Sequence, residues 1–159
     1  MPHVRPLTSI GRSDNLIEGK SYYLAEVESI LRLVRASTSG DRYLLVADEL
    51  FRGTNPEERI AGAAEVLRFM AKQPHFVFAA THDADLVRLL CPDYSPFHFT
   101  ETLDSNGLSF DYTIRPGACT SHNAIALLEH VGYPEAIVAR ARSLAEALER
   151  GAAIGEDPR

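Results

Sequence analysis

Residues 43–54 read YLLVADELFRGT, and this stretch decides the fold. Five apolar residues, Tyr43 to Ala47, run without a polar break and stop at two adjacent carboxylates, Asp48 and Glu49. A run of this length is too short for a helix and is typical of a strand buried in a sheet. Ligands in open α/β folds bind at the carboxyl ends of such strands. The stretch therefore predicts a nucleotide-binding edge and raises the question of what its two acids act on.

The residues that follow predict a helix with a well-defined start. Asn55 can cap the helix, Pro56 suits its first position, and Glu58 completes a box-like capping pattern. The helix should run to about Lys72. Its inward stripe is expected to consist of Ile60, Ala64, Leu67 and Met70.

A second unbroken apolar run lies at Phe76–Ala80 and ends on polar residues, among them His82. The order strand, helix, strand, with both strands unbroken, predicts a parallel sheet that is buried on both faces. Because the carboxyl ends of parallel strands meet at one edge, we expect His82 to lie near Asp48 and Glu49. The predicted fold class is therefore α/β.

The remaining segments are predicted from periodicity and turn residues. Residues 1–14 show no clear period and are expected to form an irregular or short extended segment, whereas the apolar spacing over 21–36 predicts a helix. Apolar and polar residues alternate around the turn Asp104–Gly107, which predicts an antiparallel hairpin with one solvent-exposed face. The other helices and a tail are expected at Asp85–Leu90, Ser121–His130, Pro134–Arg150 and Gly151–Arg159.

Composition limits the class of protein. A chain of 159 residues with 45% apolar content suits one globular domain. Its 16 basic and 22 acidic residues give a net charge of -6, opposite in sign to that of a domain that grips DNA phosphates. Cys91 and Cys119 are far apart and outside metal-ligand spacing, which favours reduced thiols. The sequence contains no apolar run of membrane-spanning length and no leader, so no membrane partner and a cytoplasmic location are expected.

Gly19-Lys20-Ser21 matches the end of the phosphate-loop pattern G-x-x-x-x-G-K-[ST]. The pattern requires a glycine five residues before Gly19, and that position is Asp14, an acid that would repel phosphate. The preceding residues, HVRPLTSIGR, also make a poor buried strand. A small enzyme that uses Gly19-Lys20-Ser21 as its own nucleotide loop remains an alternative, but the sequence argues against it.

The stretch DNLIEGKSYYLAEV, residues 14–27, resembles the signature segment of the MutS family, whose members are related to the ABC-type ATPases. That segment has an Asp-x-Leu opening, a Gly-x-Ser at a helix start, an aromatic residue and a Glu. Here these are Asp14, Leu16, Gly19, Ser21, Tyr23 and Glu26. The resemblance places Ser21 at a helix N-terminus, where backbone N–H groups and the helix dipole favour an anion.

Three further segments resemble the same family, in the family's order. LLVADELFRGTNPEERIAGAAEVL, residues 44–67, is similar to its Walker B strand, catalytic glutamate and following loop. VFAATHDADL, residues 77–86, is similar to its switch-histidine strand, and residues 107–141 are similar to its closing hairpin and helical pair. The ordered set covers most of the chain and is far more specific than any one motif. It implies a partial P-loop NTPase fold of the ABC type, with a parallel sheet, flanking helices, an antiparallel hairpin and a C-terminal helical pair.

The resemblance implies ATP and Mg²⁺ as cofactors and gives three residues direct roles. Glu49 would orient or deprotonate the attacking water, and Asp48 would hold Mg²⁺ through water. His82 would sense the γ-phosphate. Taken one by one, the acids could instead be an ordinary pair at a strand end, and the histidine could be structural.

Other residues are implied to act across a dimer interface. Arg52, Gly53 and Thr54 would form a loop that crosses to a second subunit. Gly19 and Ser21 would reach the γ-phosphate of ATP bound in the partner.

The implied organisation has three parts. Residues 1–120 would be the C-terminal half of a MutS-type ATPase domain, residues 121–150 a helix-turn-helix dimerisation element, and residues 151–159 a tail. The phosphate loop would lie upstream of Met1, so the chain should be inactive until a homodimer or the upstream half of the same protein completes it. DNA mismatch repair or related DNA processing is implied, with DNA bound through domains absent from this chain. The alternative is a non-catalytic assembly module.

Overall fold

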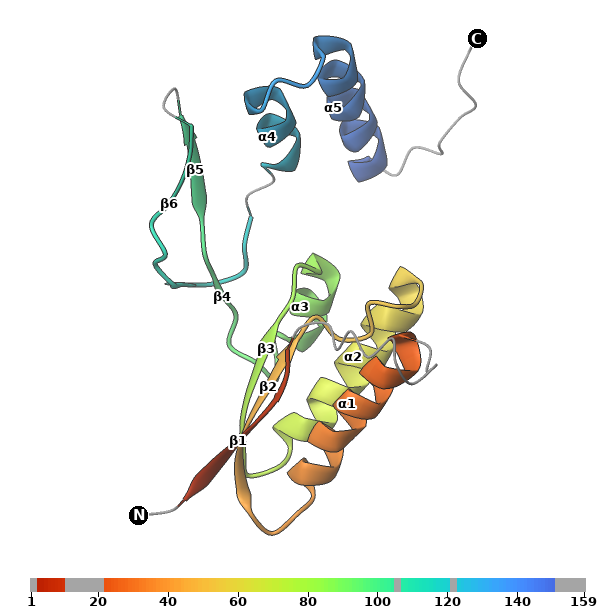
Figure 1. Cartoon of the computed structure of the whole chain (residues 1–159), viewed down its shortest axis with the longest axis vertical. Helices are drawn as coiled ribbons and strands as arrows, with labels where there is room; N and C mark the ends of the chain where they lie inside the picture. The colour runs from red at the N-terminus through yellow and green to blue at the C-terminus, as the bar shows by residue number, and fades with distance from the viewer. Residues whose placement is uncertain (1–2, 11–21, 105–106, 121–122, 151–159) are drawn as a thin grey trace. The chain divides into compact units, whose positions relative to one another are not determined.

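The computed structural model describes residues 3–10, 22–104, 107–120 and 123–150. The chain divides into two compact units, which are described separately (Figure 1). Unit 1 comprises residues 1–96, and unit 2 comprises residues 97–159.

The described part of unit 1 is built on a three-stranded parallel sheet in the order β1-β2-β3. Its strands are β1 (Val4–Ser9), β2 (Arg42–Asp48) and β3 (Phe76–Ala80). In the register of the sheet, Leu45 lies between Leu7 and Val77. The predicted parallel α/β arrangement of β2 and β3 is confirmed.

Strand β1 was not predicted as a member of the sheet. Residues 1–14 were expected to be either irregular or a short extended segment. The extended alternative is correct for Val4–Ser9. The strand lies at the edge of the sheet and is largely exposed, so it needs no apolar run. Its Pro6 lacks an N–H, which an edge strand tolerates better than a central one.

The helices of unit 1 are α1 (Tyr22–Ser37), α2 (Pro56–Ala71) and α3 (Ala84–Leu90), close to their predicted bounds. These helices lie beside the sheet (Figure 1). Together with the sheet they enclose one apolar core. The core consists of Ile30, Leu33, Leu45, Ala47, Leu50, Ala63, Ala64, Leu67, Met70, Leu86 and Leu90.

The start of α2 follows the prediction in part. The side chain of Asn55 accepts a hydrogen bond from the Glu58 N–H at 2.9 Å, as expected of a cap. The Glu58 carboxylate accepts from the Thr54 hydroxyl at 2.8 Å, so this acid binds the residue that precedes the cap.

The two faces of the sheet differ in burial. Leu45 and Ala47 of β2 are buried against the helices. Phe76 and Phe78 of β3 lie on the opposite face and are 65% and 62% exposed. The prediction that the sheet is buried on both faces is therefore wrong for the described residues, because their helices cover one face.

Unit 2 contains the predicted hairpin, formed by β5 (Glu101–Asp104) and β6 (Gly107–Phe110) as an antiparallel pair. A short pair of β4 (Phe97–His98) and β7 (Arg115–Pro116), which was not predicted, is also antiparallel. The expected alternation ends at Phe110, because Tyr112 has a φ of 52° and leaves the extended conformation.

The C-terminal helices of unit 2 are α4 (Ala124–His130) and α5 (Glu135–Glu149), with Gly132 between them at a φ of 88°. A positive φ favours glycine, so Gly132 suits the turn between the two helices. The expected boundary between the ATPase half-domain and the dimerisation element, after residue 120, stays a prediction.

In the part of the chain that the structure describes, no helix combines the length and the apolar character needed to cross a membrane.

Tyr94 makes the stability of unit 1 depend on pH. Its hydroxyl donates to the Leu67 carbonyl at 2.9 Å. Burial, and then the charge of Asp93, raises the pKa of Tyr94 from 10.0 to about 12. A group whose pKa is raised by folding contributes stability that is complete below its unfolded pKa and is lost as the pH rises through its folded pKa.

We therefore expect the free energy of unfolding to fall between pH 10 and about 12, and Tyr94→Phe to flatten this fall. Urea denaturation at a series of pH values measures both slopes. Tyr112→Phe is the control, because Tyr112 is 83% exposed. An equal fall in the wild type and in Tyr94→Phe would contradict the prediction.

Candidate functional site

The turn after β2 has an unusual backbone. Glu49 and Phe51 have φ values of 53° and 59°, in the left-handed region that residues with a side chain seldom adopt. Each such residue costs about 1–2 kcal/mol. The Glu49 N–H also donates to the Ala80 carbonyl at 2.9 Å, which joins the turn to the end of β3. Strain of this kind is found preferentially at functional sites.

The structure brings Glu49 and His82 into direct contact. Glu49 Oε1 accepts hydrogen bonds from the His82 backbone N–H at 2.9 Å and from His82 Nδ1 at 2.7 Å. Because a carboxylate oxygen only accepts, the ring carries its proton on Nδ1, and Nε2 is left for another partner. The Glu49 side chain is 13% exposed, whereas that of His82 is 77% exposed. The imidazole thus lies at the surface of the unit, above a largely enclosed carboxylate.

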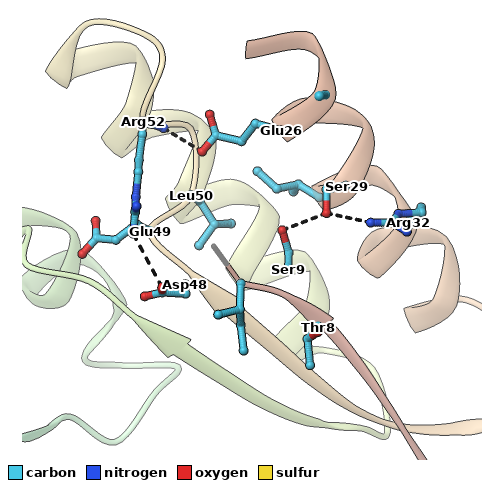
Figure 2. Close-up of a pocket in the computed structure, with 12 residues that line it drawn as sticks. Thr8, Ser9, Glu26, Ser29, Arg32, Asp48, Glu49, Leu50 and Arg52 are labelled. Carbon is cyan, nitrogen blue, oxygen red and sulfur yellow. Dashed lines mark hydrogen bonds and ion pairs between the residues drawn. The ribbon is translucent and has the colours of Figure 1, made fainter. Parts of the chain in front are cut away.

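Asp48 pairs with the loop that follows it, and this loop is tied to helix α1. Arg52 Nη2 lies 3.6 Å from Asp48 Oδ2, and Figure 2 shows the arginine side chain reaching from the loop toward this acid. The backbone of the same loop is held by Glu26, whose Oε1 and Oε2 accept from the N–H groups of Arg52 and Gly53 at 2.9 and 3.4 Å. Glu26 was named only as part of the resembling signature segment, and the structure gives it this contact.

Gly53 is required by the close approach of the loop to α1. A Cβ atom at this position would lie 2.9 Å from Tyr23 Cδ2 and 3.1 Å from Tyr23 Cβ, closer than side chains tolerate. Residues 52–54 therefore pack against a helix of the same chain. Whether this loop also crosses to a second subunit stays a prediction.

A cleft lies between β1, α1 and the turn after β2, with a volume of about 170 Å³. Thr8, Glu26, Asp48 and Glu49 are among the described residues that line it. On its α1 side, the Ser9 and Ser29 hydroxyls lie 3.0 Å apart and Arg32 donates to Ser29 at 2.9 Å (Figure 2). Whole-ligand pockets measure roughly 300–1,000 Å³, so this cleft is smaller than a pocket that encloses an entire ligand.

Asp48 fits the chemistry of a magnesium ligand. Its side chain is 35% exposed and borders the cleft, with Arg52 as the neighbouring cation. Among the described residues, no three His, Cys, Asp or Glu side chains gather as a ready metal site. Mg²⁺ keeps several waters and takes one or two carboxylates together with substrate phosphates, so a single carboxylate is sufficient. Gly19 and Ser21, the other predicted nucleotide-binding residues, lie outside the described residues.

One ion pair beside the site was missed by the sequence analysis. Arg59 and Asp83 form two parallel hydrogen bonds next to His82. A signal was present, because Arg59 precedes Ala63 by four residues and Leu67 by eight. It therefore lies on the buried stripe of α2, where a charged residue needs an opposite charge.

Comparison with known proteins identifies the family. The sequence matches MutS domain V over residues 3–149. It is 30% identical over 141 residues to the DNA mismatch repair protein MutS of Thermus aquaticus, covering 89% of this chain and 17% of that protein. It is 33% identical over 148 residues to the DNA mismatch repair protein MutS 2 of Halobacterium salinarum, covering 90% of this chain and 17% of that protein.

A third relative, the DNA mismatch repair protein MutS of Treponema pallidum (strain Nichols), is 32% identical over 162 residues, which cover 99% of this chain. The chain spans 17% of the length of each of these relatives. The similarity thus extends over nearly the whole chain and over a small part of each longer protein. The chain belongs to the MutS family, in which it matches domain V.

Proposed function

We propose that this chain is the C-terminal portion of a MutS-like ATPase domain with a partial P-loop NTPase fold. It binds ATP and Mg²⁺ at a dimer interface and acts in DNA mismatch repair or related DNA processing. The observation that carries this proposal is the pair of hydrogen bonds from His82 to Glu49 at the carboxyl ends of β2 and β3, with Asp48 beside them. The printed names of the relatives, DNA mismatch repair proteins, support the biological role.

Glu49 is the proposed catalytic carboxylate. Both of the described contacts from His82 are made to Oε1, which leaves Oε2 to orient a water or accept its proton. Fixed orientation matters because phosphoryl transfer depends mainly on positioning and on charge stabilisation. The left-handed backbone at Glu49 and its hydrogen bond to Ala80 hold the carboxylate in one place.

His82 is the proposed γ-phosphate sensor. Its Nδ1–H is engaged by Glu49, and its ring is largely exposed. A ring protonated on both nitrogens donates from Nε2 to a phosphate oxygen while Nδ1 stays on the carboxylate. The two residues then respond together to the presence of the terminal phosphate.

Asp48 is the proposed Mg²⁺ residue, acting through water. Bound Mg²⁺ supplies neutralisation of the phosphate charge. Asp48 holds this position at the end of β2, and Arg52, 3.6 Å away, balances its charge in the absence of the metal.

The phosphate loop is proposed to come from another segment of polypeptide. The Gly-Lys-Ser at residues 19–21 lacks the first glycine of the pattern, and the relatives are much longer than this chain. An upstream half of the same protein is one source of the loop. In the dimer, Gly19 and Ser21 of one subunit contact the γ-phosphate of the ATP that is bound in the other subunit. The loop formed by residues 52–54 also crosses to that subunit.

A second proposal is a non-catalytic assembly module, with residues 121–150 as the dimerisation element. It is favoured by the apolar surface of the helical pair in unit 2. Exposed positions there are Val131, Tyr133, Ile137, Leu144 and Leu148. These side chains are available to a partner chain whether or not ATP is hydrolysed.

The isolated chain is expected to bind Mg-ATP weakly and to hydrolyse it only at the background rate. The reason is the incomplete phosphate loop, whose backbone N–H groups and lysine supply most of the affinity for phosphates. Isothermal titration calorimetry measures the affinity, and a phosphate-release assay measures turnover. Joining the chain to a phosphate-loop half should restore both activities.

Micromolar binding of Mg-ATP by the isolated chain would contradict this prediction and would favour Gly19-Lys20-Ser21 as an autonomous loop. Joined protein that binds ATP and dimerises without turnover would favour the assembly module. Substituting Glu57, an exposed carboxylate in the first turn of α2 that lies outside the proposed site, gives the matched control for each assay.

A further inference from the structure

Asp83 occupies a capping position but does not cap. It is the N-cap residue of α3, with an extended backbone, and its side chain makes no hydrogen bond to the helix N-terminus. Aspartate at this position ordinarily accepts from the first backbone N–H groups of the helix. Here Arg59 Nε donates to Asp83 Oδ2 at 2.9 Å, and Arg59 Nη2 donates to Oδ1 at 3.0 Å. The carboxylate is therefore used for a contact with α2.

The Arg59–Asp83 pair has the geometry of a strong and directional contact. The two side chains are 20% and 16% exposed, more enclosed than the Arg5–Asp41 pair of the same unit at 67% and 52%. A planar guanidinium that makes two parallel hydrogen bonds to a carboxylate fixes orientation as well as distance. The pair thus joins the first turns of α2 to the turn that follows β3.

The segment held in this way carries His82. The Thr81 hydroxyl accepts from the Asp83 N–H at 3.1 Å, which closes a turn around His82. The histidine side chain is 77% exposed, so packing does little to fix it. Besides its two contacts with Glu49, the placement of His82 therefore depends on the backbone on either side of it, which the Asp83 contacts hold.

We propose that the Arg59–Asp83 ion pair is a positioning element that keeps the His82 N–H and Nδ1 on the Glu49 carboxylate. Arg59 and Asp83 are positioning residues, since they act through His82 and do not touch the reacting atoms. The proposed placement of His82 is argued from the contacts described above. Only the effect of this placement on ATP turnover rests on the proposed function.

Two substitutions separate this role from simple stabilisation of the fold. Asp83→Asn keeps the shape of the side chain and removes its charge, so the ion pair is lost. Because the Asp83 side chain makes no hydrogen bond to the start of α3, the substitution removes no cap from this helix. Arg59→Gln removes the same pair from the other side. If both act only by breaking this pair, the double variant should be no worse than either single variant.

The experiment measures residue-resolved amide hydrogen exchange in the full 159-residue chain. We expect exchange of the His82 amide to rise by about tenfold or more in both variants, as the loss of a hydrogen bond to a charged group implies. The imidazole ¹⁵N signals of His82 should also lose the Nδ1-protonated pattern. Arg5→Gln is the matched control, because it breaks an ion pair in the same unit and should leave His82 unchanged.

Unchanged exchange of the His82 amide in Asp83→Asn would overturn the proposal. A uniform rise over the amides of β2, α2 and β3 would also overturn it, because that pattern reports stabilisation of the whole unit. Turnover is measured separately in protein joined to a phosphate-loop half. An absence of turnover in the joined wild type contradicts the proposed function, and the exchange result still decides the positioning role.

Discussion

Glu49→Gln, made in the chain joined to a phosphate-loop half, is expected to lower steady-state ATP turnover by about 10²–10⁴-fold. Binding of Mg-ATP should be retained. The amide keeps the shape of the carboxylate and can still accept from His82 through its oxygen. It carries no negative charge, however, and cannot take a proton from water. The loss should therefore fall on kcat, with little change in the dissociation constant.

Glu57→Gln is the matched control for this prediction. Glu57 lies eight residues further along the chain, in the first turn of α2, and its side chain is exposed. Substituting it removes one carboxylate from the same segment and leaves the Glu49–His82 contact in place. Phosphate release at saturating ATP gives the turnover, and calorimetry gives the affinity. Hydrolysis by Glu49→Gln at the wild-type rate would show that another group activates the water.

The central part of the fold could be predicted because it is encoded locally. The apolar run of β2 and the following acids specify a strand and its end, and the second run does the same for β3. Since parallel strands share one carboxyl edge, the proximity of Glu49 and His82 follows from strand order alone. Strand β1 could not be found in this way, because its sequence, VRPLTS, contains no unbroken apolar run.

The supporting contacts of the site are not encoded locally. Glu26 binds the backbone of residues 52 and 53, and Arg59 binds a carboxylate 24 residues further along the chain. No helical or strand period relates the members of these pairs. The sequence does mark one member, since an arginine on an apolar helix stripe calls for an opposite charge. Which acid supplies that charge becomes visible only when α2 and the end of β3 are placed together.

The unbroken apolar run of β3 predicted that both faces of the sheet are buried. In the described residues, helices cover only one of these faces. Phe76 and Phe78 stand on the other face, opposite Leu44 and Val46 of β2. Their exposure of 65% and 62% is unusual for phenylalanine in a sheet. The sequence pattern of β3 thus fits a sheet with a further layer on this face, which a second polypeptide segment would provide.

The isolated chain is therefore expected to self-associate through this face, and Phe76→Ser with Phe78→Ser should weaken the association. Burying one phenylalanine side chain contributes about 1.5–3 kcal/mol. Removing both should raise the dissociation constant by about two orders of magnitude or more. Strand β3 also lies at the edge of the described sheet, where unpaired backbone groups favour pairing with another chain.

Light scattering over a wide concentration range measures the association, and Phe97→Ser with Phe99→Ser is the matched control. These residues are 58% and 59% exposed but lie in unit 2, so their substitution leaves the β3 face intact. Joining the upstream half should cover the β3 face and convert the variable association into a defined dimer. A sharp monomer mass with a cooperative unfolding transition at high temperature would contradict the prediction. If the unit 2 substitutions weakened the association more than the β3 substitutions, the contact surface would lie outside β3. The four phenylalanines are similarly exposed, so a difference between the two pairs reports where the surface lies.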